Sequence, residues 1–247
     1  MSEPGFFSKV AEWFTDPAHW SGPSGIPIRL WEHVQTSGVA VLIAGLIALP
    51  IAMYIGHQRR MEFFVVSVGN LGRAIPSFGL LVIFALWIGL QLDWPAPYRP
   101  AIILAMVLLA IPPILTNTYV GIQAVDPDVL DAGRGVGMTE GQVLRSLEMP
   151  LAAPLIVAGL RTAAVQVVAT ATLAALIAGG GLGRYIVDGY ATSDEVEIFS
   201  GAVLVALLAI FTELAFGLLT RAVTPRTASR GRKARIEILP TETGARA

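Results

Sequence analysis

DPDVLDAGRGVGMTEGQVLRSLEMP, residues 126–150, is a polar stretch with several glycines, set between two long hydrophobic runs. Asp126 is suited to cap the start of a helix. Pro127 suits the first helical position, because proline gives up only an amide that would be unpaired there. This helix is expected to end at one of three glycines, Gly133, Gly135 or Gly137. These residues predict a short helix that ends in a glycine turn.

A second helix is predicted directly after that turn. Thr139 and Gln142 have the spacing of a capping box, in which each side chain accepts a hydrogen bond from the backbone of the other residue. Pro150 is expected to end this helix. Its apolar side is formed by Val143, Leu144 and Leu147. The whole stretch is too polar to cross a membrane and too well capped to be a loose loop.

The overall composition is that of a membrane protein. The chain has 247 residues, of which 54% are hydrophobic and 14% charged, and its mean hydropathy is +0.66. A net charge of −1 gives no basic footprint for nucleic acid. The absence of cysteine excludes disulfides and thiolate metal sites.

On either side of residues 126–150 the chain reads as a series of membrane-spanning helices. Residues 61–90 are interrupted near Arg73 and Pro76, but this run is too short to cross twice, because two helical crossings need roughly 40 residues. We therefore expect one long helix there, kinked or broken near Pro76. The predicted spans are 36–56, 61–90, 101–123, 151–178 and 198–220. The predicted fold class is an all-α membrane protein with about five transmembrane helices.

Three regions are expected along the chain. Residues 1–33 are rich in Trp and Phe, which suits an interfacial or extracytoplasmic segment, although an ordinary irregular N-terminus fits equally well. Residues 34–222 form the transmembrane domain. Residues 223–247 are basic and are expected to form a flexible tail on the cytoplasmic side. No removable leader is evident in the first region.

The distribution of Lys and Arg predicts the orientation, because these residues prefer the cytoplasmic flank of a span. With five crossings, one side of the membrane receives Arg59, Arg60, Arg134, Arg145 and the basic tail. The opposite side receives only Lys9, Arg29, Arg99 and Arg184. The N-terminus is therefore predicted outside, and residues 126–150 and the C-terminus inside.

Ionisable residues within spans are costly and are candidates for function. Arg161 and Glu213 lie at similar depths in the fourth and fifth predicted spans, so we consider two alternatives: a salt bridge between the two helices, or side chains that each face a water-filled cavity. Arg73 has no evident partner. Together with Pro76 it marks either a solute pathway or a broken-helix site.

Several kinds of chemistry are missing. A phosphate-binding P-loop needs a lysine between glycine and Ser or Thr, and neither Lys9 nor Lys233 has these neighbours. The histidines, His19, His33 and His57, are scattered, so no metal site is predicted and solvated or interfacial positions are expected. A glycine cluster after the fourth span is interpreted as a hinge or a point of close packing in an outer loop. Its members are Gly179, Gly180, Gly181 and Gly183.

The stretch from Asp131 to Pro150 closely resembles the EAA motif of ABC-importer permeases, Glu-Ala-Ala-x3-Gly-x9-Ile-x-Leu-Pro. Ala132, Gly137 and Pro150 match the motif directly. Four positions depart from it: Asp131 replaces Glu, Gly133 replaces Ala, Leu147 replaces Ile and Met149 replaces Leu. The glycine at position 133 leaves the length of the first helix open.

Two further segments, 68–83 and 160–183, look like the corresponding parts of osmoprotectant-importer permeases, which handle glycine betaine, choline, carnitine and similar amines. The resemblance covers roughly residues 34–220. Methionine-type permeases are the alternative within the same class. A secondary transporter is a distant alternative, because only Glu213 is available as an ion-coupling carboxylate. A channel would need no EAA-like stretch, and a membrane enzyme would need a catalytic cluster that is absent.

The resemblance implies a type I ABC-importer permease that has no ATPase site of its own and lies in the cytoplasmic membrane. ATP and Mg²⁺ would be bound by partner ATPase subunits. The other implied partners are a second permease, either a copy or a paralogue, and an extracytoplasmic substrate-binding protein. The outer loop near the last span is acidic, and it either docks this binding protein or is simply solvated. Its acidic residues are Asp188, Asp194, Glu195 and Glu197. Gly137 would form the tight turn. The residues expected to couple transport to the ATPase are Asp131, Ala132, Gly133, Gly137, Met138, Leu147 and Pro150.

Overall fold

The computed structural model describes residues 5–91, 98–177 and 179–224, and within these ranges every regular element is a helix. The membrane-length helices are α2 (Ile26–His57), α5 (Tyr98–Gln123), α8 (Met149–Ala174) and α10 (Glu195–Val223). The shorter elements are α1 (Phe6–Thr15), η1 (Pro17–Trp20), α3 (Glu62–Ala74), α4 (Ser77–Gln91), α6 (Pro127–Gly135), α7 (Glu140–Val143), η2 (Leu144–Glu148), η3 (Ala175–Ile177) and α9 (Gly183–Thr192). Residues 225–247 of the predicted basic tail lie outside the described residues.

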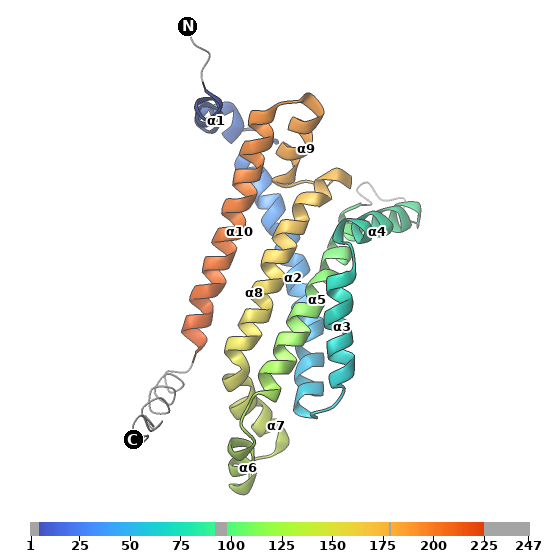
Figure 1. Cartoon of the computed structure of the whole chain (residues 1–247), viewed down its shortest axis with the longest axis vertical. Helices are drawn as coiled ribbons and strands as arrows, with labels where there is room; N and C mark the ends of the chain where they lie inside the picture. Colours follow the sequence, from blue (N-terminus) through green and yellow to red (C-terminus); the bar gives the residue numbers. More distant parts are fainter. Residues whose placement is uncertain (1–4, 92–97, 178, 225–247) are drawn as a thin grey trace, which may run out of the picture.

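The bundle is organised around α5, which packs against both α2 and α8 (Figure 1). Helix α10 lies along α8 on one flank, and α3 lies along α5 on the other. Helices α6 and α7 protrude from one end of the bundle, and α1 and α9 lie at the opposite end. The α6–α7 end is also where α10 finishes.

Small residues allow these helices to approach closely. Ala40, Ala44, Ala48 and Ala52 recur every four residues along α2 and are fully buried in the main core. Ala105, Ala110 and Ala163 play the same part on α5 and α8. Packing of small residues is the usual way that helices associate in lipid, where apolar side chains gain little by leaving the surrounding hydrocarbon.

Within the described residues, four helices are long and apolar enough to cross a membrane, or up to five if α3 and α4 count as one broken span. This agrees with the predicted all-α fold with about five spans. The helix of the first predicted span starts at Ile26 rather than at residue 36. The additional turns mix apolar and polar residues, and their Glu32 and His33 accept hydrogen bonds from the glycine segment that follows α8.

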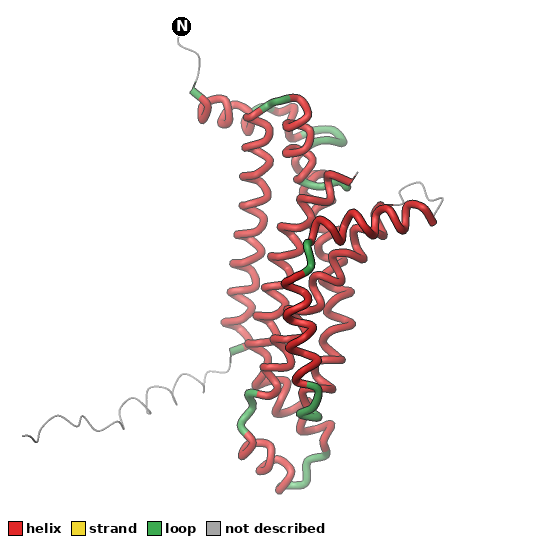
Figure 2. The backbone as a smooth tube through the Cα atoms, turned by 45° about the vertical axis from the view of Figure 1, so that its right-hand side comes forward, coloured by secondary structure: helices red, strands yellow, loops and turns green. Residues whose placement is uncertain are grey.

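The second predicted span is broken where the sequence indicated. Helices α3 and α4 meet at 87°, and α4 projects sideways from the bundle (Figure 2). Ile75 is extended, as expected for a residue before proline, and Pro76 has no amide with which to continue the helix. The side chain of Arg73, just before the break, lies outside the described part of the structure.

The expected helix end at Pro150 is wrong. Residues 140–177 form one continuous helix, which runs from the capping box directly into the membrane-length α8. A π-helical turn, η2, precedes Pro150. A proline ring normally clashes with the carbonyl four residues before it, here that of Ser146. The wider π turn provides room, so the helix continues.

Candidate functional site

The polar segment at the α6–α7 end has the local structure predicted from its caps. Asp126 Oδ1 accepts a hydrogen bond from the Asp128 amide at 2.9 Å, and α6 ends at Gly135. Both arms of the capping box are present, with Thr139 N donating to Gln142 Oε1 at 2.8 Å. Gly137 forms the turn between the helices with φ +89°, a conformation that other residues rarely adopt.

A small apolar cluster holds α6 against the following helix. Its buried residues are Val125, Leu130 and Val143, and Met138 and Leu147 pack against them. Gly133 lies at the point of closest approach, where a Cβ atom would lie 2.6 Å from Leu147 Cδ1 and 3.2 Å from Met138 Sδ, so that a larger residue would force these side chains to shift. The glycine at position 133 therefore does not shorten α6. It allows the helix to lie against Leu147.

The predicted coupling residues fall into two groups. Gly133, Met138 and Leu147 meet inside the segment, where they fix its shape. Asp131, Ala132, Gly137 and Pro150 are exposed. Val136, between α6 and the turn, is an apolar side chain that is 81% exposed and was not among the predicted residues. The segment thus combines a fixed interior with an outer surface available to a partner.

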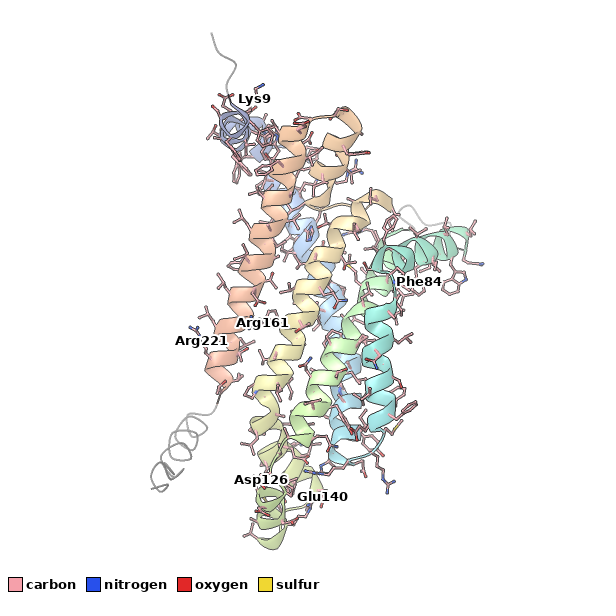
Figure 3. The ribbon with its side chains drawn as sticks, in the orientation of Figure 1. Lys9, Phe84, Asp126, Glu140, Arg161 and Arg221 are labelled. Carbon is pink, nitrogen blue, oxygen red and sulfur yellow. The ribbon has the colours of Figure 1, made fainter. Side chains whose placement is uncertain are left out.

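A chain of charged groups connects this segment to α2. Arg134 contacts Asp131 at 3.2 Å and Glu140 at 2.9 Å, and the hydrogen bonds to Glu140 raise the pKa of Arg134. Asp126 and Glu140 mark this end in Figure 3. His57, the last residue of α2, lies 3.3 Å from Glu140 and 2.6 Å from Glu148.

Sequence reasoning missed both His57 and Glu148. His57 was expected to be solvated or interfacial, but its ring is largely enclosed, and Glu148 is 1% exposed. Glu148 shares a helical face with Leu144 and Leu151, and an acid on an apolar face signals a need for a partner. The partner is 91 positions away, beyond the reach of local pattern. Within the residues that the structure describes, no group of three or more His, Asp or Glu is placed to hold a metal ion.

Arg161 and Glu213 are paired, so of the two arrangements considered the salt bridge is present. Arg161 Nε donates to Glu213 Oε2 at 2.7 Å, and the guanidinium makes a second contact with the same carboxylate. The side chains are 39% and 42% exposed, so the pair lies at the edge of the bundle, between α8 and α10. The pair holds α10 against α8, and the apolar stretch of α10 is otherwise not buried within the chain.

A polar cavity of about 230 Å³ lies between α3, α5 and α8. Its polar lining side chains are Thr116, Asn117, Thr162 and Gln166. The Oγ1 atom of Thr116 is buried without a hydrogen-bond partner in the structure. Gly69 and Gly72 of α3 complete the wall, so the cavity adjoins the helix that carries Arg73 and ends before Pro76. Its neutral polar residues come from two helices, α5 and α8, and were not predicted.

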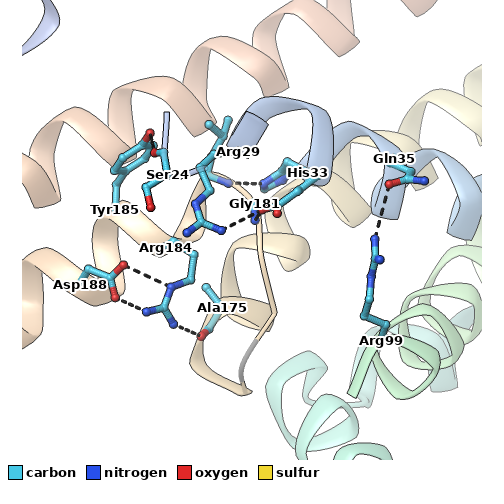
Figure 4. Close-up of polar contacts among 12 residues, drawn as sticks. Ser24, Arg29, His33, Gln35, Arg99, Ala175, Gly181, Arg184, Tyr185 and Asp188 are labelled. Carbon is cyan, nitrogen blue, oxygen red and sulfur yellow. Dashed lines mark hydrogen bonds and ion pairs between the residues drawn. The ribbon is translucent and has the colours of Figure 1, made fainter. Parts of the chain in front are cut away.

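At the opposite end of the bundle, side chains at the start of α2 accept hydrogen bonds from the glycine segment, residues 179–183, which contains the glycine cluster (Figure 4). Gly181 N donates to Glu32 Oε2 at 2.9 Å, and Leu182 N donates to His33 Nδ1 at 3.3 Å. Since Nδ1 accepts, Nε2 carries the proton and donates to the Val168 carbonyl at 3.0 Å. His33 is therefore a buried structural residue, contrary to the expectation of solvated or interfacial histidines.

Close packing accounts for the glycines of this segment. A Cβ atom at Gly180 would lie 2.4 Å from Glu32 Oε2, and Gly181 has φ +89°. Gly179 and Gly183 are equally tight against backbone carbonyls of Ala174 and Thr172. A hinge role for the four glycines stays a prediction.

Two of the acidic residues at this end already have partners within the chain. Asp188 pairs with Arg184 (Figure 4), and Asp194 caps α10 by accepting from the Val196 and Glu197 amides. Glu195 and Glu197 lie in the first turn of α10, where negative charge is favoured by the helix dipole.

Comparisons with known proteins agree on one class. Residues 42–229 match the family described as "Binding-protein-dependent transport system inner membrane component". The chain is 36% identical to the carnitine transport permease protein OpuCD of Listeria monocytogenes, over 80% of this chain and 86% of that one. It is 35% identical to the glycine betaine/carnitine/choline transport system permease protein OpuCD of Bacillus subtilis, over 82% and 86% of the two chains.

Among solved structures, an inward-facing form of the MetNI methionine ABC transporter is similar, with a TM-score of 0.71. The match covers 85% of this chain and 100% of that one at 21% identity. This likeness concerns the fold alone.

We expect charge reversal at Arg161 or Glu213 alone to lower the thermal stability of the purified protein, because each leaves two like charges facing each other between α8 and α10. Combining Arg161→Glu with Glu213→Arg should recover most of the loss. Polar contacts between membrane helices are worth on the order of 1 kcal/mol, so the shift in melting temperature is expected to be a few degrees. A double variant no more stable than either single one would contradict the pairing.

Proposed function

The chain belongs to the family of binding-protein-dependent transport system inner membrane components, and from this premise we propose that it is the permease of an ABC importer for osmoprotectants of the glycine betaine, choline and carnitine kind. It is a permease component and not an ATPase. The named substrates of its relatives support the proposed solute class. The fold likeness to a methionine transporter does not favour methionine, because at 21% identity it concerns the fold alone.

The observation that carries the proposal is the pre-shaped α6–α7 segment. Its interior is fixed by the Gly133–Leu147 contact, and its outer side presents Asp131, Ala132 and Val136. These features suit a surface that seats in a groove of an ATPase subunit, which would bind ATP and Mg²⁺. Because residues 140–177 form one helix, displacement of the segment acts directly on α8 in the membrane.

Further partners are expected at other surfaces of the bundle. A second permease, either a copy of this chain or a paralogue, would complete the membrane core. The end that carries α1 and α9 would face outward and receive the substrate-binding protein. This orientation places the N-terminus outside and the C-terminus inside, and it is required if α6 and α7 dock on a cytoplasmic ATPase.

The polar cavity between α3, α5 and α8 is proposed as part of the solute pathway. Its lining offers hydroxyl and amide groups and no charged side chain among the described residues. A pathway must bind a solute well enough to admit it and weakly enough to release it. Neutral donors such as Asn117 and Gln166 suit the carboxylate of glycine betaine or carnitine and the hydroxyl oxygen of choline, whereas a fixed positive charge would hold a carboxylate and repel a cation.

Replacement of Gly137 by valine tests the coupling role. The left-handed turn at φ +89° disfavours a β-branched residue, so the α6–α7 surface should be distorted while the membrane core stays folded. In a complex reconstituted with its ATPase and binding protein, we expect ATP hydrolysis to lose its stimulation by solute by tenfold or more, equivalent to about 1.4 kcal/mol of coupling. Gly135→Ala is the matched control, because a Cβ there meets nothing within 4 Å. Normal stimulation in the valine variant would count against the assignment.

Uptake by proteoliposomes tests the solute and the pathway together. We expect ATP-dependent uptake of glycine betaine, choline or carnitine, and none of methionine. Gln166→Leu should raise the KM for that solute several-fold, because a lining hydrogen bond worth about 1 kcal/mol is lost. Gln58→Leu, the same change at an exposed site outside the cavity, should leave KM unchanged. Uptake of none of the three solutes would contradict the solute class, and an unchanged KM would contradict the pathway.

A further inference from the structure

The end of α2 and the turn after it lie beside the coupling segment, defined here as residues 126–150. Just before the start of the segment, Arg59 Nη2 donates to the Val125 carbonyl at 3.3 Å, and Gln123 Nε2 at the end of α5 donates to the Gly56 carbonyl at 3.1 Å. At its far end, His57 contacts Glu148. The last residues of α2 therefore lie between the end of α5, which precedes the segment, and the start of α8, which follows it.

His57 is the centre of this arrangement. Its Nδ1 atom lies 2.6 Å from Glu148 Oε2, and its Nε2 atom lies 3.3 Å from Glu140 Oε2. Both ring nitrogens thus face carboxylate oxygens, which accept but do not donate. The 2.6 Å contact is a hydrogen bond between Nδ1 and the Glu148 carboxylate, so it orients the ring between the two acids.

The contact with Glu148 is strong because it is enclosed. Glu148 is 1% exposed, and a buried carboxylate is tolerated only where a partner compensates for the lost water. Hydrogen bonds to an ionised acceptor are shorter and stronger than those between neutral groups. The contact therefore fixes the end of α2 relative to the π turn from which α8 begins.

The other end of α2 holds a second fixed point. There Glu32 and His33 clasp the glycine segment after α8, through Gly181 and Leu182 (Figure 4). Helix α2 has 32 residues, which span about 48 Å at 1.5 Å per residue. Helix α2, which contains Pro50, thus connects the coupling segment to the glycine segment at the opposite end of the bundle as one continuous helix.

We propose that His57 is a positioning residue that locks α2 to the coupling segment, so that movement of α6 and α7 is passed through α2 to the glycine segment at the opposite end. This rests on the proposed function, in which the segment is moved by an ATPase. The continuous α7–η2–α8 helix is one route into the membrane, and α2 provides a second route that ends on a different element.

The first arm of the test needs no transport activity. The 247-residue chain lacks cysteine, so Val136→Cys provides a single site for a spin label on the exposed tip of the segment. In the permease in lipid nanodiscs, His57→Ala should increase the mobility of this label, and His57→Gln, which keeps a donor for Glu148, should restore most of the ordering. Gln58→Ala is the matched control at the neighbouring exposed position. Unchanged mobility in His57→Ala would overturn the proposal.

The second arm separates positioning from stability. His57→Ala leaves the Glu148 carboxylate without its partner, whereas adding Glu148→Ala removes the unpaired charge. We expect the double variant to recover the thermal midpoint lost in His57→Ala, while solute stimulation of the assembled ATPase stays at least about fivefold below that of the unsubstituted complex. Recovery of stability and stimulation together would overturn the proposal, because His57 would then serve the fold alone.

The two arms also distinguish this inference from the proposed function. A complex of the unsubstituted chain that shows no solute-stimulated ATP hydrolysis would contradict the proposed function, even if His57→Ala increased the mobility of the spin label. Normal stimulation in the unsubstituted complex with an unaffected label in His57→Ala would contradict the inference alone.

Discussion

The contact between the buried Glu148 carboxylate and His57 determines how the polar α6–α7 end of this protein packs against its apolar helix bundle. Glu148 lies where the chain changes from the capped α7 to the membrane-length α8, and His57 ends α2 beside it. A buried carboxylate without a partner would be costly, so α2 and α8 are held in one arrangement at this point. Because α5 enters the same segment beside the end of α2, the three central helices share one junction.

The helices and turn of the polar segment could be predicted from the sequence because they depend on interactions between residues close together in the chain. Caps and turns depend on neighbours within three or four residues, and Asp126, Thr139 with Gln142, and Gly137 all have the predicted roles. The prediction was wrong at Pro150, because the π turn that accommodates the ring has no sequence signature of its own. His57 and Glu148 were missed for a related reason: two residues distant in sequence become partners only through packing.

In the membrane-length helices, too, features set by local sequence were predicted and features set by long-range packing were mostly missed. Hydrophobic length predicted the spans, and Pro76 predicted the break between α3 and α4, although not its 87° angle. Depth along two spans was sufficient to suggest Arg161 and Glu213 as partners. The polar cavity was not predicted, since Thr116, Asn117, Thr162 and Gln166 are unremarkable on their own helices and meet only in the folded bundle. The family could be predicted because the EAA-like motif is contiguous in the sequence, whereas the polar residues that line the cavity come from separate helices.

The central claim is that the tip of the α6–α7 segment docks on an ATPase subunit. Since the chain has no cysteine, a photo-crosslinker attached to Val136→Cys reports on this surface alone, and one on Tyr190→Cys, an exposed site on α9, reports on the opposite end. In the assembled transporter the account predicts a covalent adduct with the ATPase subunit from position 136 and none from position 190. An ATPase adduct from position 190, or none from position 136 in a complex that hydrolyses ATP, would contradict it.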